Sequence, residues 1–271
     1  MDPKEFDSEN AKETFRKHID SYIYNYPFDL ALFPEDKIFI KDLVKSLYFK
    51  PGVWAKIEQL RRKDIEQKVN GVDYPVNYNN MIGTCVLSAL VARDKRLSDK
   101  IIYGTSRGGG THDIGKTGIS DLVVHKEGTY TPQERLAMQM HSLLTLKMLE
   151  EEGEDDYITK ECGYGHHIWI KPPKDPLAKI KSYPDVSEDF VLSVPARIVC
   201  IADTIDSIVK GRPHRKSNEY RVGSVSRAKS EIYRESRIWE QNPDGIHFDP
   251  DLVPYFMKYL NRIPTDDGNH Q

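Results

Sequence analysis

Apolar residues recur every three or four positions along much of this chain, which is the spacing that places them on one face of an α-helix. The stretch at residues 38–47 shows the pattern clearly, because five aliphatic side chains follow it there. Every regular element that the pattern predicts is a helix. The predicted helices span residues 8–24, 33–47, 54–64, 80–97, 131–152 and 195–206.

Local signals mark some of the helix starts. Ser8 is the predicted N-cap of the first helix. Thr131, Pro132 and Glu134 predict a second start, with the threonine as cap, the proline at the first helical position and the glutamate three residues after the cap. Four glycines within residues 104–110 indicate a flexible loop before His112 instead, because each glycine costs about 1 kcal/mol relative to alanine inside a helix. Such a loop could cradle a phosphate, although it matches no phosphate-loop motif.

Length and composition bound the class of protein. The chain has 271 residues, of which 38% are hydrophobic and 30% charged, as in an ordinary soluble globular protein. That length suits one large domain or two modest ones. A turn at residues 71–75 predicts a boundary. We therefore expect an N-terminal helical region at 1–75, a larger domain at 76–262 and a flexible tail at 263–271.

Charge and cysteine content narrow the partners and the compartment. A net charge of −3 argues against general binding to nucleic acid polymers or to anionic membranes. The three cysteines are odd in number and widely separated, which indicates a reduced compartment. The first residues lack the pattern of a signal peptide, and no run approaches the ~20 apolar residues of a membrane span. The expected location is the cytoplasm.

Residues 111–119 carry the densest chemistry, because His112, Asp113 and Lys116 put two metal ligands and a cation within five residues. If the segment is helical, Lys116 lies one turn on, above His112, so that the ligands and the positive charge face one cavity. A metal with a phosphate beside it would suit that cavity. The alternative is an ordinary surface hydrogen bond between the histidine and the aspartate. A basic segment at 212–216 could hold phosphates or form a solvated turn.

Further ligand candidates follow in order along the chain. His141 borders an apolar helix face, where a histidine with satisfied hydrogen bonds is the alternative, and the doublet His166-His167 comes next. Asp203 and Asp206 then lie three residues apart in a largely apolar helix. A buried carboxylate is costly unless it is paired or coordinated. Asp203 is therefore a better ligand candidate than an ordinary surface acid.

Taken in order, these blocks resemble the HD-GYP group of the HD-domain phosphohydrolases. The matching blocks are residues 112–119, His141, His166-His167, 195–206, 212–216 and 248–253. The resemblance covers roughly residues 80–260. It implies an all-α fold, namely an HD-domain helical bundle, with a smaller helical region before it. It also implies bound iron or manganese and hydrolysis of a cyclic dinucleotide, above all cyclic di-GMP.

The same resemblance implies the roles of individual residues. Asp113 and Lys116 serve catalysis, with Lys116 beside the attacked phosphate, and Arg212 and Arg215 hold the substrate phosphates. Histidine and carboxylate ligands suit such metals, and a lysine would offset charge that develops on phosphate oxygens. The implied metal ligands are His112, Asp113, His141, His166, His167 and Asp203.

The chain also departs from the family pattern. The family supplies a further histidine from the helix before the His-Asp pair, but no histidine lies between His18 and His112. Ile168 stands where a glutamate is expected after the histidine doublet, and the Gly-Tyr-Pro signature is missing. We therefore expect one or two divalent metals per chain and not three.

Three functions fit these observations. The first is a metal-dependent phosphodiesterase of cyclic dinucleotides, which the retained lysine and arginines favour. The second is a degenerate member that binds a nucleotide or a protein, which the missing histidine favours. The third is an HD phosphohydrolase of another phosphate ester. A homodimer or a protein partner through the N-terminal region is also left open.

Overall fold

A computed structural model describes residues 7–25, 31–66, 76–168, 191–211, 223–236 and 247–264. All regular elements in these ranges are helical, which confirms the predicted all-α class. The longer helices are α1 (Ser8–Tyr24), α3 (Pro34–Ser46), α4 (Pro51–Glu66), α5 (Val76–Asp94), α6 (Asp99–Thr111), α8 (Pro132–Gln139), α9 (His141–Glu151), α10 (Tyr157–Gly165), α12 (Val194–Lys210), α14 (Val225–Ser236) and α15 (Val253–Leu260). The short elements are η1 (Ile114–Gly118), α7 (Asp121–Val124) and η2 (Pro250–Leu252).

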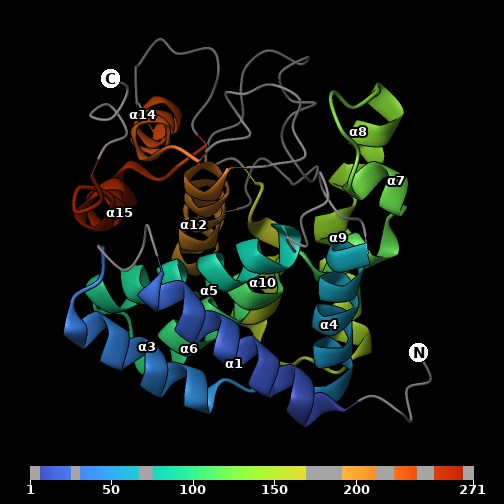
Figure 1. Ribbon diagram of the computed structural model, residues 1–271, viewed down its shortest axis with the longest axis horizontal. Helices are drawn as coiled ribbons and strands as arrows, with labels where there is room; N and C mark the ends of the chain where they lie inside the picture. Colours follow the sequence, from blue (N-terminus) through green and yellow to red (C-terminus); the bar gives the residue numbers. More distant parts are fainter. Residues whose placement is uncertain are drawn as a thin grey trace.

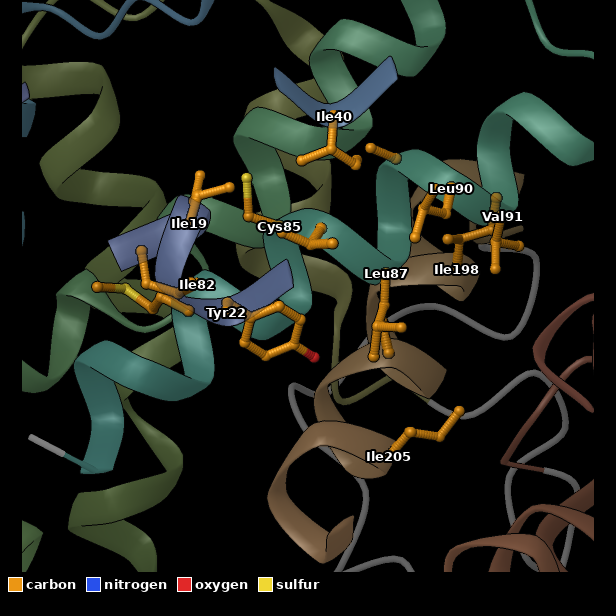
Figure 2. Packing of buried hydrophobic residues seen from close by; sticks show 14 of the residues in the cluster. Ile19, Tyr22, Ile40, Ile82, Cys85, Leu87, Leu90, Val91, Ile198 and Ile205 are labelled. Atoms are coloured by element: carbon orange, nitrogen blue, oxygen red, sulfur yellow. The ribbon is translucent and has the colours of Figure 1, made fainter. Parts of the chain in front are cut away.

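Helix α5 lies at the centre of the bundle, with α6 and α12 packed against it (Figure 1). Every residue from 80 to 92 is buried, as expected of a helix that is apolar on all sides. Figure 2 shows Leu87 and Leu90 of α5 beside Ile198 and Ile205 of α12. This contact holds α12, which carries one of the predicted metal ligands, against the centre of the fold.

The N-terminal helices α1, α3 and α4 pack on the same central helix. Ile19 and Tyr22 of α1 and Ile40 of α3 belong to one hydrophobic cluster with Cys85 of α5 (Figure 2). The region before residue 75 and the region after it therefore share a core. The turn at 71–75 lies outside the described residues, so the division into two domains stays a prediction.

The three glycines at 108–110 lie inside α6, so the predicted flexible loop is wrong. They occur where α6 passes very close to its neighbours. A Cβ on Gly109 would lie 2.8 Å from the backbone oxygen of Thr84 in α5, and one on Gly108 would lie 2.3 Å from Cβ of Cys162 in α10. The packing that these close approaches permit outweighs the conformational cost of glycine in a helix.

The first helix is capped by a different residue from the one predicted. Asp7, and not Ser8, is the N-cap, because the Asp7 carboxylate accepts hydrogen bonds from the backbone N–H groups of Glu9 and Asn10 in the first turn of α1. The predicted start at Thr131 is confirmed: its hydroxyl accepts from the backbone N–H of Glu134, and the Glu134 carboxylate accepts from the backbone N–H of Thr131.

The single helix predicted at 131–152 is two helices, α8 and α9, which meet at Met140. The interruption makes His141 the first residue of α9. A histidine predicted for the middle of a helix therefore lies at a helix end. Among the described helices, none has the length and apolarity needed to cross a membrane.

Candidate metal centre

The six predicted ligands come together from five elements, and most of them lie at helix ends. His112 and His166 are the residues that terminate α6 and α10, His141 begins α9, and Asp203 lies within α12. Helix ends suit ligands, because the chain changes direction there and can aim a side chain away from the helix axis. The cluster consists of His112, Asp113, His141, His166, His167 and Asp203.

The polar atoms of the cluster are close enough to surround one or two ions. Nε2 of His141 lies 3.3 Å from Oδ1 of Asp113 and 3.0 Å from Nε2 of His166. Nε2 of His112 lies 3.5 Å from Oδ2 of Asp113 and 3.6 Å from Oδ1 of Asp203. The His167 ring lies 4.1 Å from the His166 ring, between centroids. Almost all of this cluster is buried.

The hydrogen bonds of three histidines fix which nitrogen carries the proton. Nδ1 of His112, His141 and His166 lies 2.8, 2.7 and 2.8 Å from the backbone oxygen three residues earlier. A carbonyl oxygen only accepts, so each Nδ1 must donate. In a neutral ring, Nε2 then carries no proton, and its lone pair points into the cluster. The lone pairs of His141 and His166 face each other at 3.0 Å, which is repulsive unless a cation lies between the rings.

Two overlapping groups of side chains could hold such a cation. Within each group the potential ligand atoms lie within 4.8 Å of one another. Nε2 of His112 is buried without a hydrogen-bond partner among the described residues, which fits a nitrogen that binds a metal. The groups are His141, His166 and His167, and His112, Asp113 and His166.

The electrostatics of the cluster keep most of its histidines neutral and its carboxylates charged. Burial, with the neighbouring histidines, lowers the pKa of His166 to about 3. Burial also lowers the pKa of His141 to about 4, although Asp113 opposes it. Burial alone would raise the pKa of Asp113, but the charges of Lys116, His112 and His141 outweigh it and hold that pKa well below the usual range. Neutral imidazoles beside ionised carboxylates are the forms that bind metal.

Lys116 lies beside the cluster, but not where a regular helix would put it. The chain turns at residues 112–113 and continues as the 3-10 helix η1, so Lys116 pairs with Asp113 and not with His112. Its Nζ donates to Oδ2 of Asp113 at 2.5 Å and to Oδ1 of Asn77 in α5 at 3.0 Å. The predicted juxtaposition of a cation and the ligands is present, with a different partner.

Comparison with known proteins identifies relatives of the chain. No family model matches it. It is 24% identical over 188 residues to a cyclic di-GMP phosphodiesterase of Pseudomonas aeruginosa, a match that covers 69% of the chain and 40% of that protein. It is also 24% identical over 179 residues to a cyclic di-GMP phosphodiesterase of Thermotoga maritima, covering 65% and 43%. A 3′3′-cGAMP-specific phosphodiesterase of Vibrio cholerae is 26% identical over 183 residues, covering 67% and 35%.

The chain is thus related in sequence to bacterial cyclic dinucleotide phosphodiesterases, in agreement with its resemblance to the HD-GYP group. Each match covers less than half the length of the curated relative concerned. The HD domain of a Listeria monocytogenes phosphodiesterase, solved with cyclic di-AMP, has a TM-score of 0.47 and 18% identity over 74% of this chain and 92% of its own, a likeness too slight to add support.

Asp206, which the sequence groups with Asp203, lies outside the cluster of candidate ligands. Its buried carboxylate pairs with Lys210 at 3.0 Å and accepts a hydrogen bond from the Tyr22 hydroxyl at 2.9 Å. The side-chain amide of Asn80 lies 3.3 Å from both Asp206 Oδ2 and the Asp203 backbone oxygen. Asp206 thus ties α12 to α1 and α5, and only Asp203 faces the histidines.

Arg212 and Arg215, the predicted phosphate-binding residues, lie outside the described residues. Conversely, Asn77, which contacts Lys116, was not predicted from the sequence. An asparagine at the start of a helix carries no chemical signature of its own, so only the arrangement of α5 beside η1 reveals it.

Lowering the pH should destabilise the metal-free protein between about pH 6.5 and pH 4. The pKa of His141 falls from 6.5 to about 4 on folding. In that window the unfolded chain binds a proton there that the folded chain does not, which costs about 1.4 kcal/mol per pH unit for each such proton. The pKa of His112 is raised instead, because Asp113 and Asp203 outweigh burial. His112 is thus protonated in both states within this window and does not oppose the trend.

Thermal unfolding in the presence of a chelator, from pH 7 down to pH 4, measures this effect. A His141→Gln variant should show a smaller loss over the same range. An unfolding temperature that does not change with pH in the wild type would contradict the neutral state of these histidines.

Replacing Gly115 with alanine should disrupt the site by displacing α9. A Cβ at Gly115 would lie 1.9 Å from the backbone oxygen of His141 and 2.6 Å from the backbone N of Thr145. Because backbone atoms cannot move aside as a side chain can, we expect a loss of about 3 kcal/mol or more in the free energy of unfolding. Gly118→Ala is the matched control, since its Cβ would meet only side-chain ends of Leu144 and Met148 at 3.3 and 3.2 Å. Chemical denaturation of both variants tests the difference, and equal stability would contradict it.

Proposed function

We propose that this HD domain is a metal-dependent phosphodiesterase that hydrolyses a cyclic dinucleotide, with cyclic di-GMP as the first candidate. The observation that carries the proposal is the pair of facing lone pairs on His141 and His166, in a buried cluster that also holds two ionised carboxylates. Such a cluster is favourable with a divalent cation and unfavourable without one. The relatives that act on cyclic di-GMP and on 3′3′-cGAMP supply the class of substrate.

The residues present fit iron or manganese. Imidazole nitrogens and carboxylate oxygens are common ligands of both ions, and the Nδ1–H bonds to backbone oxygens orient each ring. A divalent cation bound there supplies Lewis-acid stabilisation of the charge that accumulates when a phosphodiester is attacked. The proposed ligands are His112, Asp113, His141, His166, His167 and Asp203.

The remaining roles belong to the cations of the chain. Lys116, held by Asp113 and Asn77, would place its ammonium beside the attacked phosphate and stabilise negative charge on the non-bridging oxygens. Arg212 and Arg215 would hold the phosphates of the substrate through charge-assisted hydrogen bonds. Asp113 would serve twice, as a ligand and as the anchor of Lys116.

The stoichiometry should be one or two metal ions per chain. The two ligand groups share His166, whose single Nε2 lone pair can bind only one ion at a time. A second ion would therefore depend more on the carboxylates of Asp113 and Asp203. Elemental analysis of protein purified without chelator and supplemented anaerobically with iron or manganese measures the number. No bound metal under either condition would contradict the proposal.

A second candidate function is a receptor that keeps the fold and binds the nucleotide without cleaving it. The absence of histidine from both α5 and α6, the two helices before the His-Asp pair, favours this alternative. Hydrolysis of another phosphate ester is the third candidate, because the cluster itself does not select the alcohol groups of the substrate.

One experiment separates these functions. The metal-loaded protein is incubated with cyclic di-GMP or with 3′3′-cGAMP, products are analysed by chromatography, and binding is measured by calorimetry. We expect linear dinucleotide or mononucleotide products that disappear after chelation. Binding without products would select the receptor, whereas neither binding nor products would remove both nucleotides as ligands.

A further inference from the structure

A series of hydrogen bonds connects Lys116 to helices α4 and α7 through Asn77. Nδ2 of Asn77 donates to Oδ1 of Asp64 at 2.7 Å, while Oδ1 of Asn77 accepts from the Lys116 ammonium at 3.0 Å. Nε2 of His125 donates to the same Asp64 oxygen at 2.9 Å. Asp64 is 2% exposed and belongs to the N-terminal helix α4. This series therefore connects the edge of the metal cluster to two elements outside the cluster.

The chemistry of the two ends fixes the orientation of the Asn77 amide. An ammonium only donates hydrogen bonds and a carboxylate only accepts them, so the amide oxygen must face Lys116 and the amide nitrogen must face Asp64. In this orientation the amide dipole lies between a negative and a positive charge and stabilises both. Asp64 also accepts from the backbone N–H of Tyr78 at 2.9 Å, so its carboxylate is held firmly.

The last turn of α4 also holds the segment that follows Lys116. Nζ of Lys63 lies 3.2 Å from the backbone oxygen of Thr117 and 2.9 Å from the carboxylate of Asp121. Neighbouring residues of α4 thus contact the backbone of η1, the side chain of Lys116 through Asn77, and the start of α7. Helix α4 carries none of the proposed ligands, but its contacts support η1 and Lys116 beside the cluster.

From this geometry we infer that Asn77, supported by Asp64 and His125, is a positioning residue that holds the Lys116 ammonium at the edge of the metal cluster. The inference rests on the proposed role of Lys116 beside the substrate phosphate. Without Asn77, the Lys116 ammonium would keep one acceptor among the described residues, the Asp113 carboxylate. A single hydrogen bond lets the flexible lysine side chain adopt several positions. With Asn77, two acceptors on different elements define its place.

Two substitutions at Asn77 separate positioning of Lys116 from simple support of the fold. Asn77→Leu removes both side-chain bonds, whereas Asn77→Asp removes the bond to Asp64 but keeps an acceptor for the ammonium. The first readout is the rate at which acetic anhydride modifies Lys116 at fixed pH, followed by peptide mass spectrometry on the metal-loaded full chain. Asn77→Leu should raise this rate about tenfold, the effect of losing one charged hydrogen bond, and Asn77→Asp should leave it near the wild-type value.

Turnover is the second readout. For the cyclic dinucleotide that the wild type hydrolyses, Asn77→Leu should lower kcat about tenfold with little change in KM, as expected when a group that acts in the transition state is misplaced. Asn79→Leu, two residues on in α5, is the matched control and should change neither readout.

Equal acceleration of Lys116 modification in both Asn77 variants would mean that the residue only supports the fold, and would overturn the inference. An unchanged rate in Asn77→Leu would overturn it as well. If the wild type hydrolyses no nucleotide but Lys116 is released only in Asn77→Leu, the proposed function fails while the positioning of Lys116 stands. The two failures are therefore distinguishable.

Discussion

Asp113→Asn should remove most of the bound metal and lower hydrolysis of the cyclic dinucleotide by about 1000-fold or more. The carboxylate faces Nε2 of both His112 and His141, and it also anchors Lys116. An amide of the same size keeps the shape of the site but loses the negative charge that balances a divalent cation. Metal-dependent stabilisation of several kcal/mol would be lost, and each 1.4 kcal/mol is a factor of ten in rate.

Asp206→Asn is the matched control for this substitution. Asp206 is also a buried aspartate paired with a lysine, but it faces Tyr22 and Lys210 and not the histidines. We expect this variant to lose stability and to keep its metal. Elemental analysis and turnover, measured on both variants at a temperature where each is folded, give the comparison. Equal metal loss in the two would show that Asp113 acts through the fold and not as a ligand.

Lys116→Ala should lower kcat about 100-fold while substrate affinity changes little. Removing one preorganised donor that stabilises developing charge costs about 100-fold to 1000-fold in kcat in well-studied enzymes. The ammonium lies beside Asp113 at the edge of the cluster, where a phosphate held by the cations would be attacked. Steady-state kinetics and calorimetric titration together separate the two effects.

Substitution of either arginine of the basic segment provides the contrast. Arg212→Ala or Arg215→Ala should weaken nucleotide binding, with each lost charged hydrogen bond worth roughly 1.5–3 kcal/mol. If Lys116→Ala weakens nucleotide binding as much as the arginine substitutions do and leaves kcat unchanged, Lys116 serves substrate binding alone.

The clustering of the proposed ligands could be predicted from the sequence because these residues are chemically distinctive and follow one another in a recognisable order. His112, His141 and Asp203 are far apart in the chain, yet the structure brings them within one buried site. Helices α5 and α12 and the start of α8 were predictable as well, since apolar spacing and the Thr131 cap are local signals, but α6 and α10, which end at His112 and His166, were not predicted.

What the sequence could not predict depends on contacts between distant elements. The glycines at 108–110 are unfavourable for a helix in isolation, and only the closeness of α5 and α10 explains them. Asp203 and Asp206 look alike in sequence, but their side chains meet different neighbours, which are His112 for Asp203 and Tyr22 and Lys210 for Asp206. The role of Asn77 likewise follows from the position of α4, not from any local pattern.

The glycines of α6 also limit how the site can adapt. Gly109 meets backbone atoms of Thr84 and Cys85 in α5, and Gly108 meets Cβ of the short side chain of Cys162 in α10, so neither contact has a long side chain that could absorb a displacement. His112 follows directly on this rigid contact, and His166 ends the helix on its other side. Their separation should be nearly constant whatever ion is bound. We therefore expect His141 to move when ions of different radius bind, because it begins the short helix α9 just after the helical interruption at Met140.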